Sequence, residues 1–227
     1  IMDAHTGAVY SLVSSPSFDP NLFTKGLSAE KWEELLANPG HPLNNKATSG
    51  QYPPGSTFKM VTALAGLEEN ITTRTARHHC EGVYTYGKDR FHCWKSIGHG
   101  HVNVIDALAE SCDIYFYEIA TKIGIDTLAE YAKKLGLGQK YGIHLPGERA
   151  GLVPTKNWKM GYFGASWQPG ETIVSSIGQG YIQATPLQMA VITARLVNGG
   201  YAVEPWITAA IDNNIYTPPK WPQLGFK

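Results

Sequence analysis

The chain has 227 residues, 43% of them hydrophobic, and its 19 basic and 19 acidic residues give a formal net charge of zero. That balance argues against a nucleic-acid partner, which requires an excess of basic charge, and no apolar run approaches the length of a membrane span. The length allows one large domain with a sizeable core. Since the sequence has no signal peptide and opens inside a hairpin-like segment, we expect a soluble fragment of a longer protein.

The first half of the chain is predicted to hold short elements separated by polar loops. Ser28 precedes a segment with acids in its first turn, which is typical of a helix start. The elements in chain order are a hairpin over 1–13, a surface helix over 28–37, a polar loop over 38–54, a helix from Ser56 to about Asn70 and an irregular Cys- and His-rich insert over about 74–101.

The second half is predicted to be mainly helical. Thr185-Pro186-Leu187-Gln188 is a capping box with proline at the first helical position, and Gly199-Gly200 would end the helix that follows. Asp126 is expected to cap another helix. The elements in chain order are a helical region over 103–124, a helix over 126–136, an irregular segment over 138–172, a helix over 185–198 and a strand over 201–210.

The segment most informative about chemistry is Tyr52-Pro53-Pro54-Gly55-Ser56-Thr57-Phe58-Lys59. The prolines and glycine force a turn, and Ser56 and Lys59 then lie at i and i+3 on one helix face, where their side chains can meet. A neutral amine can take the serine proton, and the free N–H groups of the helix start can stabilise an oxyanion. This arrangement is typical of a serine acyl-transfer enzyme. In the structural alternative, Ser56 only caps the helix and Lys59 extends to solvent.

Three further segments extend the comparison beyond this motif: Glu110-Ser111-Cys112-Asp113, Leu145-Pro146-Gly147-Glu148 with Gly151-Leu152-Val153-Pro154, and Ile177-Gly178-Gln179-Gly180. With them, nearly the whole chain resembles the transpeptidase domain of class B penicillin-binding proteins, nearest to the penicillin-binding protein 2 group of the cell-elongation type. The resemblance implies an α/β (α+β) fold of the penicillin-binding-protein and serine β-lactamase type, with a helical region packed on an antiparallel sheet. It also implies a single partial domain over 1–227.

The resemblance implies a role for each residue of the motifs. Ser56 would attack the D-Ala-D-Ala end of a peptidoglycan stem peptide, release the terminal D-Ala and form an acyl-enzyme that an amine of a neighbouring stem resolves. Lys59 would be the general base, and Ser111 would relay a proton to the leaving nitrogen. A β-lactam would mimic D-Ala-D-Ala and leave a long-lived adduct on Ser56. Catalysis would need no cofactor.

The chain departs from the family pattern in two places. Asp113 stands where the Ser-x-Asn motif has asparagine, and a carboxylate near Lys59 favours the charged ammonium over a neutral base; alternatively, Asp113 caps a helix that begins at Ile114. The family's Lys-Thr/Ser-Gly motif, which would bind the substrate carboxylate, is absent. We therefore expect a fold that is incomplete at the C-terminus and a fragment that acylates poorly, unless Lys220 or Lys227 replaces the motif.

Cysteine and histidine are concentrated in one part of the sequence. All three cysteines lie between positions 80 and 112, and five of the eight histidines lie between 78 and 101. Thiolate and imidazole are ligands that zinc prefers. The candidate ligands of a structural zinc ion are Cys80, Cys93, His99 and Cys112, with His79, His92 and His101 as alternates.

Two other interpretations of this cluster stay open. Cys80 and Cys93 could form a disulfide in an oxidising envelope, leaving Cys112 as a buried free thiol, or neither a disulfide nor a metal site forms. Because Cys112 is next to Ser111, a metal would brace the active-site segment as a structural element rather than take part in chemistry.

Two other functions compete with transpeptidation. A class D β-lactamase also carries Ser-Thr-Phe-Lys, but it deacylates rapidly, and a non-catalytic penicillin-binding sensor domain would release no D-Ala. The resemblance further implies cell-wall elongation and rod shape on the periplasmic side of the bacterial envelope. The full-length protein would then have an N-terminal transmembrane anchor absent from this chain, and a cell-wall glycosyltransferase and elongation-complex proteins as partners.

Overall fold

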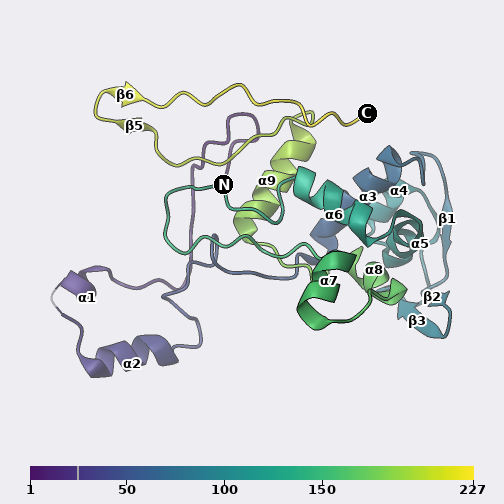
Figure 1. Cartoon of the computed structure of the whole chain (residues 1–227), viewed down its shortest axis with the longest axis horizontal. Coiled ribbons are helices and arrows are strands. Elements are labelled where there is room, and N and C mark those ends of the chain that lie inside the picture. Colours follow the sequence, from purple (N-terminus) through teal and green to yellow (C-terminus); the bar gives the residue numbers. More distant parts are fainter. Residues whose placement is uncertain (25) are drawn as a thin grey trace.

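The computed structural model describes residues 1–24 and 26–227, and most of its regular structure is helical. In Figure 1, α3 to α6 and α8 gather in one part of the molecule with β1, β2 and β3 beside them, whereas α1 and α2 lie on an excursion away from it. The helices are α1 (Asn21–Thr24), α2 (Ala29–Ala37), the 3-10 helix η1 (Gly55–Phe58), α3 (Lys59–Glu68), α4 (Val104–Ala109), α5 (Asp113–Ile123), α6 (Ile125–Lys134), α7 (Lys156–Phe163), α8 (Pro169–Ser175) and α9 (Pro186–Val197). Within the described residues, no helix has the length and apolar character that crossing a membrane requires.

The strands are short and antiparallel. Across residues 1–24 and 26–227 they form three two-stranded pairs: β1 (His78–Cys80) with β4 (Gly100–Val102), β2 (Val83–Tyr86) with β3 (Asp89–His92), and β5 (Ala210–Ile211) with β6 (Asn214–Ile215). The predicted class, helices combined with antiparallel strands, is confirmed. The strand part consists here of small pairs rather than one broad sheet.

Two segments predicted to be irregular contain regular structure. The insert over 74–101 holds β1, β2, β3 and the start of β4, whose three or four residues are too few to show the alternation that marks a strand. The segment over 138–172 holds α7 and most of α8. Both helices carry start signals that the prediction missed, since Thr155 caps α7 and Pro169 opens α8 after the capping box of Gln168.

Two predicted β elements are reduced to isolated bridges. The hairpin over 1–13 is limited to a bridge between Met2 and Val9, and the strand over 201–210 to single bridges at Tyr201 and Trp206, with only Ala210 in a strand. Alternating apolar residues thus give extended chain here without a long ladder, because pairing also depends on a neighbouring strand.

The helical region over 103–124 is divided into α4 and α5 by a turn at residues 110–112. Ser111 adopts a φ of +54° in this turn, which is uncommon for a residue other than glycine. Cys112 is the N-cap residue of α5, so Asp113 is the first residue of the helix. The alternative interpretation, in which Asp113 caps a helix that begins at Ile114, is wrong. Similarly, Gly124 and not Asp126 precedes α6.

Helix α5 lies at the centre of the core because it is apolar on nearly every side. Tyr115, Phe116 and Ile119 are fully buried in it, and the helix packs against both α3 and α8. This packing fixes η1 and the start of α3, which carry Ser56 and Lys59, against the start of α5, which carries Asp113.

Gly178 holds the turn before Ser56 from the opposite side. The N–H of Gly55 donates to the carbonyl of Gly178 at 2.9 Å. Gly178 has a φ of +71°, and a Cβ there would collide with the Gly55 carbonyl and the Cβ of Phe58. Glycine is therefore required at this position both by its backbone conformation and by the space available.

We expect Gly178→Ala to lower the free energy of unfolding by about 2 kcal/mol or more, through left-handed strain and displacement of the Ser56 turn. Gly161→Ala on α7 is the matched control, because a Cβ there meets no atom within 4 Å, and it should be neutral or stabilising by about 0.5 kcal/mol. Urea unfolding curves measure both values. Equal effects of the two substitutions would show that the contact at Gly178 does not hold the turn.

Candidate active site

Ser56 is exposed, and it lies in η1 directly after the turn at Pro53-Pro54-Gly55. Its Oγ accepts a hydrogen bond of 2.9 Å from Ser111 Oγ. The first N–H groups of a helix have no partner within the helix, so a nucleophile in this position lies beside donors suited to an oxyanion.

Lys59, one turn later, is only 1% exposed. Its Nζ donates to Asp113 Oδ1 at 2.6 Å and to both the Oγ and the carbonyl oxygen of Ser111 at 2.9 Å. These bonds use all three N–H groups of the ammonium. The side chain therefore does not extend to solvent, as the structural alternative required, but is paired inside the protein.

No hydrogen bond joins Ser56 directly to Lys59 within the described part of the chain. The two are connected through Ser111 Oγ, whose turn between α4 and α5 places the hydroxyl between them. An ammonium can only donate, so in this arrangement the donors point from Lys59 toward Ser56. When Lys59 is neutral, its Nζ can accept a hydrogen bond from Ser111 Oγ, and Ser111 Oγ can accept one from Ser56 Oγ. The Ser56 proton can then pass through Ser111 to the amine.

Trp94 is a residue of the site that the sequence did not indicate. Its backbone N–H donates to Asp113 Oδ2 at 3.0 Å, and its indole N–H donates to the carbonyl oxygens of Glu110 and Ser111 at 3.1 and 3.0 Å. Trp94 thus ties the insert to the turn that carries Ser111. The position of this tryptophan directly after a candidate metal ligand, Cys93, is the sequence signal that could have identified it.

Ser56, Trp94, Ser111 and Asp113 line a cleft of about 580 Å³. Besides the predicted Ser56, Ser111 and Asp113, its walls include His92, Tyr117, Ile177 and Gln179. Burial raises the pKa of the Tyr117 phenol, which keeps it neutral. Lys220 and Lys227 do not reach the cleft: Lys220 lines a different pocket beside Trp221, and Lys227 bonds to Glu68.

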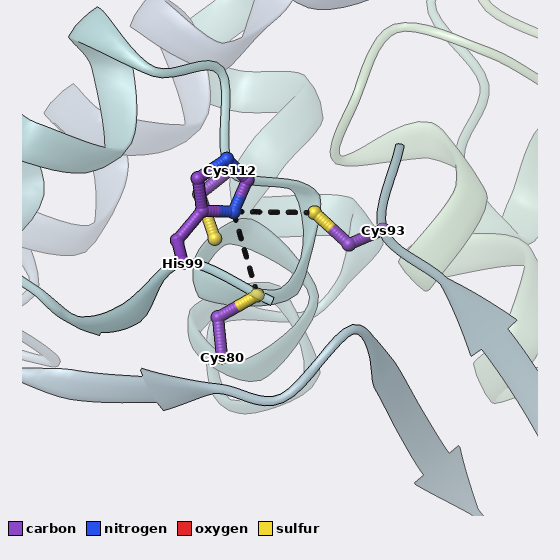
Figure 2. A group of neighbouring side chains, drawn as sticks. All are labelled: Cys80, Cys93, His99 and Cys112. Atoms are coloured by element: carbon purple, nitrogen blue, oxygen red, sulfur yellow. Dashed lines mark hydrogen bonds between the residues drawn. The ribbon is translucent and has the colours of Figure 1, made fainter. Parts of the chain in front are cut away.

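The four predicted zinc ligands lie together, and one of them, Cys93, lines this cleft. The candidate ligand atoms of Cys80, Cys93, His99 and Cys112 are all within 4.8 Å of one another. Figure 2 shows His99 Nδ1 pointing at the sulfurs of Cys80 and Cys93, each 3.5 Å away, with the Cys112 sulfur alongside. All three cysteines are free thiols, so the structure does not form the alternative Cys80–Cys93 disulfide.

The geometry of this cluster fits one tetrahedral zinc ion. Zn–S and Zn–N bonds of about 2.3 and 2.1 Å place a sulfur and a nitrogen about 3.5 Å apart. His99 Nε2 is buried without a hydrogen-bond partner and lies 3.9 Å from Glu110 Oε2, near the position of a carboxylate that orients a metal-bound histidine.

The alternates do not join the cluster. His79 and His101 face each other across β1 and β4 with ring centroids 4.6 Å apart, and His92 lines the cleft. Burial raises the pKa of the Cys93 and Cys112 thiols, which favours the protonated form of these two side chains when no metal is bound. Glycine at position 98 allows the segment before His99 to approach Cys80 closely, since a Cβ at Gly98 would collide with the Cys80 carbonyl.

Comparison with known proteins identifies the family of the chain. The family model described as "Penicillin binding protein transpeptidase domain" matches residues 1–227. The chain belongs to this family. Peptidoglycan D,D-transpeptidase MrdA of Acinetobacter baumannii is 43% identical over 211 residues, which cover 92% of this chain and 31% of the relative. MrdA of Escherichia coli K12 is 42% identical over 207 residues, covering 90% and 33%.

Solved structures of penicillin-binding protein 2 (PBP2) have the same fold. Pseudomonas aeruginosa PBP2 in complex with WCK 5153 superposes with a TM-score of 0.91 at 40% identity, covering 97% of this chain and 48% of that one. Helicobacter pylori PBP2 in complex with MreC gives a TM-score of 0.88 at 36% identity, covering 94% and 40%. The resemblance to the cell-elongation type is confirmed, and the chain spans about a third of the length of its curated relatives, 31% and 33% for the two MrdA proteins.

We expect Ser111→Ala to lower the rate of penicillin acylation at least about 10²-fold, the scale for a positioned proton-transfer group, because it removes the contact between Ser56 and Lys59. Lys59→Ala should have a similar effect. The double variant should acylate little more slowly than either single variant, since both substitutions interrupt the same proton relay from Ser56 through Ser111 to Lys59. Stopped-flow kinetics with a fluorescent penicillin measures these rates. If Ser111→Ala acylates at the wild-type rate, the relay is not the proton path.

Proposed function

We propose that the protein is a peptidoglycan D,D-transpeptidase that works through an acyl-enzyme on Ser56. The observation that supports this most directly is the pair of 2.9 Å contacts that join Ser56 Oγ, Ser111 Oγ and Lys59 Nζ. They connect an exposed hydroxyl in the cleft to a buried amine behind it, which is the pairing that acyl transfer requires. The names of the MrdA relatives support the same activity.

Acylation begins when Lys59 is neutral. Ser56 Oγ attacks the carbonyl of the penultimate D-Ala, and its proton passes through Ser111 Oγ to Lys59 Nζ. When the tetrahedral intermediate collapses, the peptide C–N bond breaks, and the proton returns through Ser111 to the leaving D-Ala nitrogen. The amine of a second stem then attacks the ester, forms the new peptide bond and frees Ser56.

Asp113 stabilises the charged stage of this cycle. Its Oδ1 lies 2.6 Å from Lys59 Nζ, so it favours the ammonium that forms after the serine loses its proton. An asparagine in this position would place no negative charge beside this amine.

The test of this function is D-Ala release from a stem pentapeptide by the full-length protein, followed with cross-link formation and acylation by penicillin. We expect D-Ala release, cross-linked product and a slowly hydrolysed penicillin adduct, all abolished by Ser56→Ala. Ser28→Ala is the control, because Ser28 belongs to a second Ser-x-x-Lys segment but only caps α2. Rapid penicillin turnover would instead indicate a β-lactamase, and acylation without D-Ala release a sensor domain.

We also propose that Cys80, Cys93, His99 and Cys112 bind one structural zinc ion, and the support for this is their geometry. The ion would cross-link the insert to the turn between α4 and α5, since Cys112 is adjacent to Ser111. It would supply no step of the reaction. This chain's own residues, Trp94 and Cys112, transmit the constraint to the catalytic relay.

Cys93→Ser is expected to lose the metal and to lower the thermal midpoint by several degrees, because binding free energy at a structural site is also folding free energy. His101→Gln is the control, as His101 lies outside the cluster. Elemental analysis of protein purified without added metal, together with calorimetry, gives both quantities. Protein without stoichiometric zinc, or equal stability losses in the two variants, would contradict the zinc site.

The cellular setting proposed for the protein follows from its relatives. Helicobacter pylori PBP2 has been solved with MreC, and another relative is described in a peptidoglycan synthase complex that coordinates polymerization and crosslinking. We infer that this protein acts on the periplasmic side of the bacterial envelope in cell-wall elongation. A membrane anchor and a polymerising glycosyltransferase partner would place its substrate at that surface.

A further inference from the structure

A second cavity lies next to the catalytic cleft, and the reaction described above does not use it. Its volume is about 630 Å³, and its walls come from the β2–β3 hairpin, α8 and the loop after α8. The ring of Phe91 in its wall packs 5.9 Å from that of Tyr117, which lines the catalytic cleft. Gln179 belongs to the cleft, while the following Gly180 and Tyr181 belong to the cavity. The two spaces therefore share a wall.

The lining of this cavity suits an uncharged ring with apolar faces. Tyr86, Phe91 and Tyr181 contribute aromatic surface, and the charges of Lys88 and Asp89 at the hairpin tip offset each other. Glu171 is neutralised by Lys159, whose Nζ lies 2.7 Å from Oε2. Burial opposes ionisation of Glu171, but the bonds from the Gln168 N–H and from Lys159 outweigh it and lower its pKa.

The aromatic surface continues outside the cavity onto α7. The ring of Tyr181 contacts those of Trp158 and Phe163, with centroids 5.2 and 5.6 Å apart, and Tyr162 stacks on Trp158 at 5.7 Å. Tyr162 is 73% exposed and Phe163 is 52% exposed. An exposed cluster of this kind, joined to a cavity, marks a binding surface rather than part of the core.

We propose that this cavity and the aromatic cluster of Trp158, Tyr162, Phe163 and Tyr181 bind the sugar rings of the glycan strand that carries the donor stem peptide. Sugar rings present apolar C–H faces that stack on aromatic side chains, and their hydroxyl and amide groups can bond to polar groups at the rim such as Gln168. The inference rests on the proposed transpeptidase function. It adds a binding site for the part of the substrate that does not react.

The spacing of the two sites matches the length of a stem peptide. A peptide of five residues spans at most about 17 Å when extended. Gln179 in the cleft and Tyr181 in the cavity are two residues apart, which limits the separation of their Cα atoms to about 7.6 Å. A peptide whose end reaches Ser56 can therefore have its glycan attachment at the cavity, and binding energy from the sugars would hold the reacting end in place.

The test compares two substrates of the full-length protein: a free stem pentapeptide, and uncrosslinked glycan chains that carry the same peptide. Gly170→Leu is designed to fill the cavity, because a Cβ at Gly170 points toward the Phe91 ring at 3.4 Å without backbone strain. Phe163→Ala removes an exposed ring of the cluster. Tyr10→Ala is the control, since Tyr10 is 72% exposed and does not line the cavity.

We expect the wild type to release D-Ala from the glycan-linked substrate with a kcat/KM at least about tenfold higher than from the free peptide. Gly170→Leu and Phe163→Ala should remove most of this preference through KM, and leave free-peptide turnover and penicillin acylation unchanged. Peptide-free glycan chains should quench the tryptophan fluorescence of the wild type and of Tyr10→Ala, but not that of Gly170→Leu or Phe163→Ala.

Several results would overturn the proposal. Equal use of the two substrates by the wild type would do so, as would a preference retained in both variants. Loss of cross-linked product with normal D-Ala release would assign the cavity to the acceptor peptide instead. If Gly170→Leu also slows acylation, the substitution has disturbed α8. The substrate preference of the surface variant Phe163→Ala then tests the glycan site. A wild type that binds glycan but neither acylates nor releases D-Ala would contradict the proposed function rather than the glycan site.

Discussion

The buried ammonium of Lys59 is the constraint on which the rest of the site depends. A lysine that is 1% exposed requires partners for its charge and for all three of its N–H groups, since an unpaired buried charge is strongly destabilising. All these partners come from one turn, where the chain leaves α4 and enters α5. The positive φ of Ser111 is the conformational cost of presenting its carbonyl, its hydroxyl and the Asp113 carboxylate to a single nitrogen.

The same turn connects the catalytic relay to the cysteine cluster. Ser111 faces Lys59, while the next residue, Cys112, faces Cys80, Cys93 and His99. Trp94, which follows Cys93 in the chain, also joins the cluster to the relay, because its N–H groups donate to Asp113 and to the Ser111 carbonyl. Any change that loosens the cluster therefore acts on the position of the Ser111 hydroxyl, although no atom of the cluster lies in the relay itself.

Local signals in the sequence were sufficient to predict the motifs and the helix caps, but not the hydrogen bonds that join one motif to another. Ser28 and Thr185 cap their helices as predicted, because a cap depends only on its neighbours in sequence. The direct contact expected between Ser56 and Lys59 from their i, i+3 spacing is replaced by the Ser111 relay. That relay depends on a left-handed residue and on tertiary pairing, which local spacing does not encode. The strands of the insert were missed because three or four residues carry too little periodicity.

The measurement that tests the account most directly is peptide mapping by mass spectrometry after reaction with penicillin. If Ser56, joined to Lys59 through Ser111, is the activated nucleophile, one penicilloyl group per molecule will be found on the peptide that contains Ser56. The adduct will be absent from peptides containing Ser28 or Ser111. An adduct on either of those serines, or none on a folded full-length protein, would contradict the assignment of Ser56 as nucleophile.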